Sequence, residues 1–164
     1  MDANDSLTND FGNVPDNGRA GLPRMAVRVG ELGLLFPWDG GREVLPAPAA
    51  SRIPNTVSWL RGVANVRGSL IPVVDAAAAL GTSRASGIPP YLLVCGDGDE
   101  ALGLLIDGLP RVLNVDVEHR MAERPHVPAL EDSLLDAYEQ DGHVWLDIDL
   151  ERLFQAFARE MTRC

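Results

Sequence analysis

Residues 53–81 read I-P-N-T-V-S-W-L-R-G-V-A-N-V-R-G-S-L-I-P-V-V-D-A-A-A-A-L-G, and the fold is decided in this stretch. The run at 70–74 is short, rich in β-branched residues and bounded by turn residues, which predicts a buried strand. Pro72 removes one ladder donor from that strand, which favours an edge position or the lip of a barrel. Asp75 should cap a short, Ala-rich helical turn that ends at Gly81.

The residues before this strand indicate a turn. Ile53 precedes Pro54, and the proline ring disfavours a helical conformation in the residue before it, so the segment should begin extended. Gly62 and Gly68 lie where a chain usually needs positive φ or a close backbone approach. Asn65, a frequent turn residue, lies between them. We therefore expect a turn at about residues 65–68 that leads into the strand.

Residues 62–75, G-V-A-N-V-R-G-S-L-I-P-V-V-D, resemble the signature of the CheW-type coupling domains of bacterial chemosensory systems. The shared features are the first glycine, the asparagine, Arg-Gly, and a proline flanked by apolar pairs and followed by aspartate. Ala76 departs from the signature, because the family prefers leucine there. Over residues 25–158 the resemblance implies an all-β fold with minor α content: two five-stranded, SH3-like β-barrels that share a core, with a C-terminal helix.

Alternating apolar runs on either side of this stretch predict two hairpins. The first covers residues 25–36. The second joins 91–95 to 101–106, and the Asp-Gly dipeptide between its strands is typical of a tight turn. Gly-Leu-Pro at 108–110 should then turn the chain before a further strand at 111–115.

The C-terminal third has three predicted elements. Residues 131–138 are interpreted as a short helix, and 142–150 alternate as a strand. On that strand Trp145 shares a polar face with Asp147, so it is either an exposed anchor or packed under the last helix. Asp149 should cap that helix, whose apolar residues fall on one side.

The domain organisation follows from composition. Residues 1–23 are polar and are expected to form a disordered N-terminal extension. Residues 24–164 are expected to form a single CheW-like domain of two intertwined barrel lobes. A connector rich in Gly, Pro and Ser near 83–90 should mark the boundary between the lobes.

The charge balance excludes several classes of partner. The chain has 164 residues, no lysine and a formal net charge of −10, and most of the acidic excess lies after residue 82. A strongly acidic surface repels phosphate backbones and anionic lipids, so neither nucleic acid nor direct membrane insertion is expected. The polar start lacks the regions of a signal peptide, and no apolar run approaches the roughly 20 residues that span a bilayer. We expect a cytoplasmic protein.

No pattern in the sequence is typical of an enzyme. The three histidines lie in separate segments, and no serine has the spacing of an activated nucleophile. His143, Asp147 and Asp149 could hold a metal only with ligands from another segment, and a solvated strand face explains them more simply. Cys95 is expected to be a small buried residue, far from Cys164. We therefore predict no catalysis, no metal and no cofactor.

The resemblance implies a receptor-binding surface, and it assigns no kinase-contact residues. In the family, the arginine of the Asn-x-Arg-Gly motif and a glutamate of an earlier strand mark the surface that meets the tip of the receptor's helical hairpin. The corresponding positions are Arg67 and Glu43, although Gly41 replaces a residue that is usually apolar. The predicted receptor-binding set is Arg67, Glu43, Asn65, Val66 and Gly68. Val63, Val66 and Val73 are the candidates to line an apolar groove.

The predicted function is a non-enzymatic adaptor. It would couple a methyl-accepting chemoreceptor, through its cytoplasmic tip, to the regulatory domain of a CheA-type histidine kinase at membrane-associated receptor arrays. Residues 59–68 look most like the PilI-like members that serve type IV pilus twitching motility. The alternative is a divergent small β-barrel binding module with a different polar or motility partner.

Overall fold

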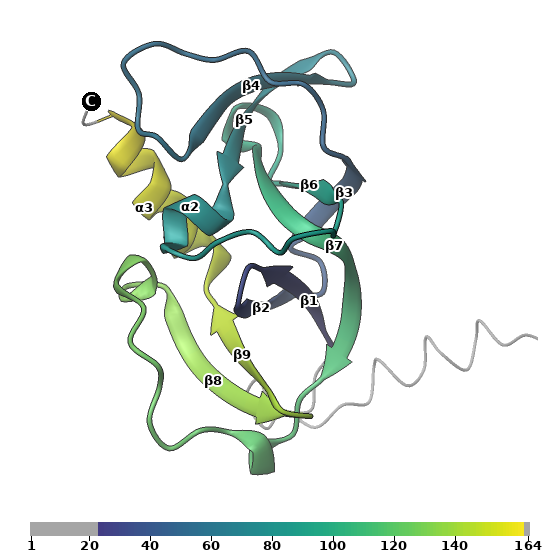
Figure 1. The fold of residues 1–164 in the computed structure, drawn as a ribbon, viewed down its shortest axis with the longest axis vertical. Helices are drawn as coiled ribbons and strands as arrows, with labels where there is room; N and C mark the ends of the chain where they lie inside the picture. The colour runs from purple at the N-terminus through teal and green to yellow at the C-terminus, as the bar shows by residue number, and fades with distance from the viewer. Residues whose placement is uncertain (1–22, 163–164) are drawn as a thin grey trace, which may run out of the picture.

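A computed structural model describes residues 23–162, so the predicted N-terminal extension, apart from Pro23, and Cys164 lie outside the described residues. Nine strands, two α-helices and three short 3-10 helices follow one another within this range (Figure 1). The strands are β1 (Pro23–Val29), β2 (Leu32–Pro37), β3 (Gly41–Pro46), β4 (Leu60–Val66), β5 (Ser69–Asp75), β6 (Pro90–Cys95), β7 (Leu102–Asn114), β8 (Leu134–Gln140) and β9 (His143–Ile148). The helices are α2 (Ala76–Leu80), α3 (Leu150–Thr162), η1 (Gly98–Glu100), η2 (Val117–His119) and η3 (Pro128–Leu130).

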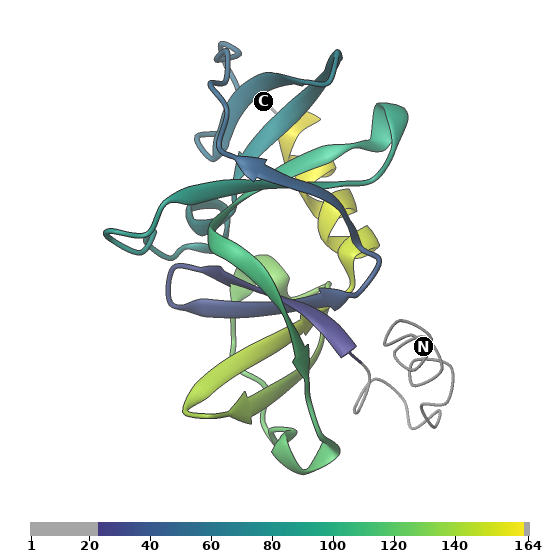
Figure 2. The same ribbon diagram turned by 90° about the vertical axis from the view of Figure 1, so that its right-hand side faces the viewer.

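Strand β7 belongs to both halves of the molecule. Its first part pairs with β6 and β5, and its second part pairs with β1. Lobe 1 therefore consists of β1, β2, β8, β9 and the end of β7, and lobe 2 consists of β3, β4, β5, β6 and the start of β7. Both views show the two twisted sheets stacked one above the other with β7 running between them (Figures 1 and 2). The predicted pair of five-stranded lobes is confirmed.

The turn predicted at residues 108–110 is wrong, because β7 continues through it. The pairing of β1 with β7 shifts register here, so no residue of β1 pairs with Leu109 or Pro110. Pro110 is tolerated at such a bulge because no ladder bond needs its missing N–H. Gly108 has φ +74°, a backbone conformation that costs glycine little. The Gly-Leu-Pro signal therefore marks the point where β7 passes from one lobe to the other.

The stretch at 53–81 folds largely as predicted. Pro72 precedes the parallel pairing of β5 with β7, which begins at Val73, so its missing N–H leaves no gap on that side. The carboxylate of Asp75 accepts a hydrogen bond from the Ala78 amide at 3.2 Å, and Gly81 ends α2 with φ +75°. Leu70 differs from the prediction, since it is 72% exposed near the tip of the β4–β5 hairpin.

Gly62 holds a close backbone approach. Its φ is +132°, and a Cβ atom added there would lie 2.0 Å from the carbonyl oxygen of Ser51. Ser51 and Val63 exchange two backbone hydrogen bonds, of 2.8 and 3.0 Å, which fasten the segment before β4 to that strand. Any side chain at position 62 would push this segment away.

Two further local predictions are wrong. The β6–β7 connection is not a tight Asp-Gly turn, because the strands end at Cys95 and begin at Leu102, with η1 in the loop. Most of residues 131–138 form strand β8 rather than a helix. Pairing with β9 along the whole of β8, together with burial of Ala137 and Tyr138 inside lobe 1, outweighs the local helical preference.

The middle of the polar face predicted for β9 is buried and not solvated, whereas His143 at its start is exposed. Both terminal nitrogens of the buried Arg24 side chain donate hydrogen bonds to the carboxylate of Asp147. The carboxylate that a metal would need as a ligand is therefore already bound to an arginine. Trp145 is buried in lobe 1, and the guanidinium groups of Arg28 and Arg111 lie over its ring, 5.6 and 5.4 Å from the centroid. It is therefore neither an exposed anchor nor packed under α3.

The largest apolar cluster draws on both lobes and both helices, so the lobes share one core. Helix α3 leaves lobe 1 after β9 and reaches lobe 2, where Phe157 packs against Trp59 with ring centroids 5.2 Å apart (Figure 2). Asp149 caps it as predicted, by accepting a hydrogen bond from the Arg152 amide. Among the described helices, none combines the length and the apolar character that a membrane span requires.

A candidate partner-binding groove between the lobes

The β4–β5 hairpin presents Arg67 at its tip. Arg67 and Gly68 have φ values of +53° and +85°, which are the signs that a two-residue type I′ turn needs at both central positions. The side-chain oxygen of Asn65 accepts a hydrogen bond from the Gly68 amide at 2.9 Å and so closes the turn. Asn65 is therefore a bracing residue at the end of β4, and the reversal itself lies two residues later than the asparagine.

Arg67 and Glu43, which the sequence assigned to one surface, are in direct contact. The Nε of Arg67 donates to Glu43 Oε2 at 2.7 Å, and the two side chains are 80% and 18% exposed. Arg67 does not brace its own turn through backbone carbonyls. It reaches instead to Glu43 on β3, and most of its side chain is exposed to solvent.

Gly41 is compensated by its neighbours. A Cβ atom at this position would lie 2.8 Å from Leu93 and 3.0 Å from Met25, so these side chains fill the space that an apolar residue would take. As a result, Glu43 keeps its pairing within the sheet and its contact with Arg67.

A groove of about 490 Å³ begins at Glu43 and runs between the lobes. Its floor is formed by buried Met25 and Leu93, and its walls come from β3, from the turn before β3 and from the middle of β7. Four large apolar side chains on these walls are exposed to solvent: Trp38, Val44, Leu109 and Val112. Eight large apolar residues are exposed among residues 23–162, so half of them gather at this groove. Such gathering marks a surface that binds another molecule.

The groove is not the one predicted from valines. Val66 is 3% exposed and Val73 is also buried, and both pack in the core of lobe 2 with Ile71 and Leu92. Neither valine lines the groove between the lobes. The exposed positions were missed because Leu109 lies in a segment interpreted as a turn, and the alternation within a bulged strand is broken there.

The charged side chains at the groove are engaged in contacts within the protein. Arg42 forms a 3.0 Å ion pair with Asp97, Arg111 covers Trp145, and Glu43 binds Arg67. These contacts occupy the charged groups near the apolar walls. Cys95, buried behind β3, has its pKa raised by burial to about 12, so its thiol is not a nucleophile at neutral pH.

Comparison with known proteins gives a consistent result. Residues 24–158 match the family model described as CheW-like domain. The chain is 40% identical over 81 residues to Protein PilI of Pseudomonas aeruginosa, which is 49% of this chain and 46% of that protein. It is 27% identical over 95 residues to a probable chemotaxis protein CheW of Rhizobium etli, which is 57% of this chain and 61% of the relative. These matches thus span about half to three fifths of the relatives' own lengths.

Two further relatives extend the comparison. Protein FrzA of Myxococcus xanthus is 34% identical over 113 residues, covering 63% of this chain and 71% of that protein. The crystal structure of the scaffolding protein TtCheW from Thermoanaerobacter tengcongensis superposes with a TM-score of 0.68 over 85% of this chain and 96% of that one, at 20% identity. The structural match supports the same fold.

Proposed function

The chain belongs to the CheW-like domain family, and on that premise we propose that it is a non-enzymatic adaptor that couples a methyl-accepting chemoreceptor to a CheA-type histidine kinase. The observation that carries the proposal is the groove between the lobes, with exposed apolar walls and the Arg67–Glu43 pair at its edge. An apolar groove of this kind suits an amphipathic helix, which lays its apolar side chains into the groove. The cytoplasmic tip of the receptor, a helical hairpin in this family, is the proposed occupant.

The apolar walls and the arginine have different roles in this proposal. Burial of Trp38, Leu109 and their neighbours supplies most of the binding free energy, since it scales with the apolar area removed from water. Arg67 sets the orientation of the receptor, because its free N–H groups can bind carboxylate or carbonyl oxygens at the hairpin tip. Asn65 and Gly68 hold the turn that presents Arg67, and they act on the receptor only through it.

Coupling by such an adaptor needs no chemistry in the adaptor itself. If the receptor is bound at the groove and the kinase's regulatory domain is bound at another surface, a change in the receptor shifts the populations of kinase states. The adaptor would work in the cytoplasm, at membrane-associated receptor arrays.

The output that we propose is type IV pilus twitching motility. In support, the identity to the PilI protein is 40%, against 27–29% for the relatives named CheW. FrzA, at 34%, is a further relative that is not named CheW.

Calorimetric titration with a receptor fragment tests the groove. Leu109→Glu places a charge on the apolar wall, and we expect it to weaken binding of the cognate receptor's cytoplasmic hairpin at least tenfold. The matched control is Val117→Glu, because Val117 is 60% exposed against 67% for Leu109 but lies in η2 and does not line the groove. Equal affinity of the two variants would place the receptor elsewhere.

A further inference from the structure

A second cavity, in lobe 2, concentrates positive charge in an acidic protein. It has a volume of about 420 Å³ and is bordered by Arg52, Arg61 and Arg84. No acidic residue lines it, although the whole chain carries a net charge of −10. The cavity shares no lining residue with the groove between the lobes, so it is a separate feature of the molecule.

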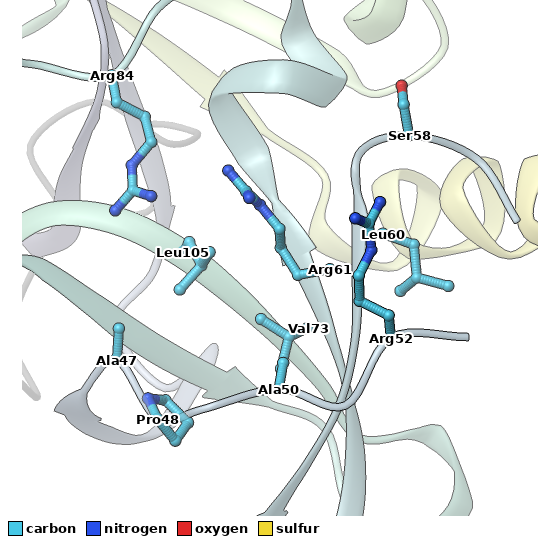
Figure 3. Close-up of a pocket in the computed structure, with 10 residues that line it drawn as sticks. All are labelled: Ala47, Pro48, Ala50, Arg52, Ser58, Leu60, Arg61, Val73, Arg84 and Leu105. Atoms are coloured by element: carbon cyan, nitrogen blue, oxygen red, sulfur yellow. The ribbon is translucent and has the colours of Figure 1, made fainter. Parts of the chain in front are cut away.

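The three arginines come from three segments that the fold brings together. Arg52 lies in the segment before β4, Arg61 lies on β4, and Arg84 lies on the connector between α2 and β6. Figure 3 shows Arg61 between the other two. On the opposite side of the cavity the figure shows apolar side chains, which form its floor: Ala47, Pro48, Ala50, Val73 and Leu105. One cavity therefore offers both positive charge and apolar surface.

Buried carboxylates position two of the guanidinium groups without neutralising all three. Asp75 accepts hydrogen bonds from Nε and Nη2 of Arg61, at 3.2 and 2.7 Å, which leaves Nη1 of that arginine for another partner. Asp107 already accepts the amides of Gly30 and Ala85, and Arg84 lies 3.9 Å from it, beyond hydrogen-bond distance.

Arg52 is the unpaired member of the group. It makes no hydrogen bond or ion pair with any residue from 23 to 162. The three arginines and the two aspartates together carry one net positive charge at this cavity. Guanidinium groups match the geometry of carboxylate and phosphate oxygens.

We infer that this cavity binds a small organic anion, with its oxyanion head held by Arg52, Arg61 and Arg84 and its apolar body on the floor of lobe 2. The volume lies within the range of about 300–1,000 Å³ that is usual for small-molecule sites. The floor reaches Val73 and Leu105, which are buried core residues, so the cavity is a recess that admits a compact ligand. A bound ligand would join the connector to β4 and thereby stiffen lobe 2.

Phenyl phosphate and inorganic phosphate are suitable probes, because they share a head group and differ by one apolar ring. Each is titrated into the full chain at low salt and followed by amide NMR. We expect saturable shifts confined to the cavity, and several-fold tighter binding of phenyl phosphate because its ring covers the apolar floor. The absence of saturable shifts with both probes would overturn the inference.

Substitutions then test which arginines bind the phosphate group. Arg52→Gln and Arg84→Gln should each weaken phenyl phosphate binding about tenfold, the effect of losing one charged hydrogen bond. Both leave the Arg61–Asp75 pair intact, so folding is preserved. The control is Arg159→Gln, which removes the same charge from an exposed position on α3 that does not line the cavity. This variant should bind phenyl phosphate as the unmodified chain does. Equal weakening by Arg159→Gln and Arg84→Gln would show a general charge effect and contradict the proposed site.

Discussion

At the scale of single residues, Arg67 carries an unusual backbone. Its φ of +53° is a conformation that costs a residue other than glycine roughly 1–2 kcal/mol, and the side chain recovers at most about 1 kcal/mol from its exposed pair with Glu43. Stability therefore does not account for an arginine at this position, since glycine adopts this backbone conformation at a lower cost in free energy. The proposed contact with a receptor would account for it.

Charge reversal separates the two roles of the pair. Arg67→Glu should leave the circular dichroism spectrum and the free energy of unfolding within about 1 kcal/mol of the original, while weakening receptor binding about tenfold or more. The double variant Arg67→Glu/Glu43→Arg restores an ion pair with reversed polarity. We expect it to recover stability but not receptor binding. Unfolding of the single variant, or recovery of binding by the double variant, would show that the residue acts through the fold alone.

Cys95 predicts how stability depends on alkaline pH. Burial raises its pKa from 9.0 to about 12, so the unfolded chain loses the thiol proton at a lower pH than the folded one. Below pH 9 both states keep the proton and stability is unaffected. Between pH 9 and 12 the thiol ionises in the unfolded chain but not in the folded one, which stabilises the unfolded state relative to the folded state. The contribution of this group should lower the free energy of unfolding by about 1.4 kcal/mol per pH unit.

Urea unfolding from pH 8 to pH 11 measures this slope. The comparison is Cys95→Ala against the parent, both in a Cys164→Ala background, so that position 95 holds the only thiol that differs. The chain has no lysine, which leaves few other groups that titrate in this range. The Cys95→Ala variant should lose part of the alkaline slope. Identical slopes would mean that the thiol ionises equally in both states.

At the residue scale, a motif was enough to predict which residues lie together. It was not enough to predict whether a side chain points to solvent or to the core. Arg67 and Glu43 were assigned to one surface, and they touch. Val66 was assigned to the same surface but faces the core, because the pleat of β4 turns it inward while its neighbours in the sequence point outward. The buried ion pair of Arg24 and the exposure of Trp38 at the groove were not predicted. Neither an ion pair in the core nor an exposed side chain in a turn produces a periodic pattern in the sequence.

At the scale of elements, short segments with strong caps were predicted well. Helix α2 begins after Asp75 and ends at Gly81, both of which act locally on the backbone. Strands β7 and β8 were predicted poorly, because distant pairing decides them. Gly-Leu-Pro normally ends a strand, yet β1 takes over from β6 at that point, and β8 exists because β9 pairs with it.

Substitution of Gly62 tests how much the close packing of β4 against the segment before it contributes to stability. Gly62→Ala would force its Cβ into the Ser51 carbonyl oxygen and also strain a φ of +132°, so we expect destabilisation by about 3 kcal/mol or more. Gly81→Ala is the matched control, because its φ is +75° but nothing lies within 4 Å of the added Cβ. That variant should cost about 1 kcal/mol. Equal losses in denaturant unfolding would show that only the backbone angle matters.

At the scale of the whole molecule, the proposed adaptor role depends on how the two lobes are joined. The groove lies where β7 passes between lobes, so a helix bound there contacts β3 of lobe 2 and the end of β7 in lobe 1 at once. The lobes share one core, and α3 is packed across them. A partner at the groove is therefore mechanically connected to the remaining surface of both lobes.

Co-sedimentation tests the adaptor most directly. Vesicles that display the cognate receptor's cytoplasmic domain are mixed with the CheA-type kinase, with and without this chain, and the kinase in the pellet is measured. We predict that the chain raises the sedimented kinase severalfold, and that Leu109→Glu abolishes the increase while still binding the kinase's isolated regulatory domain. If the kinase sediments equally without the chain, or if the chain binds neither partner while folded, the molecule is a β-barrel binding module of another kind.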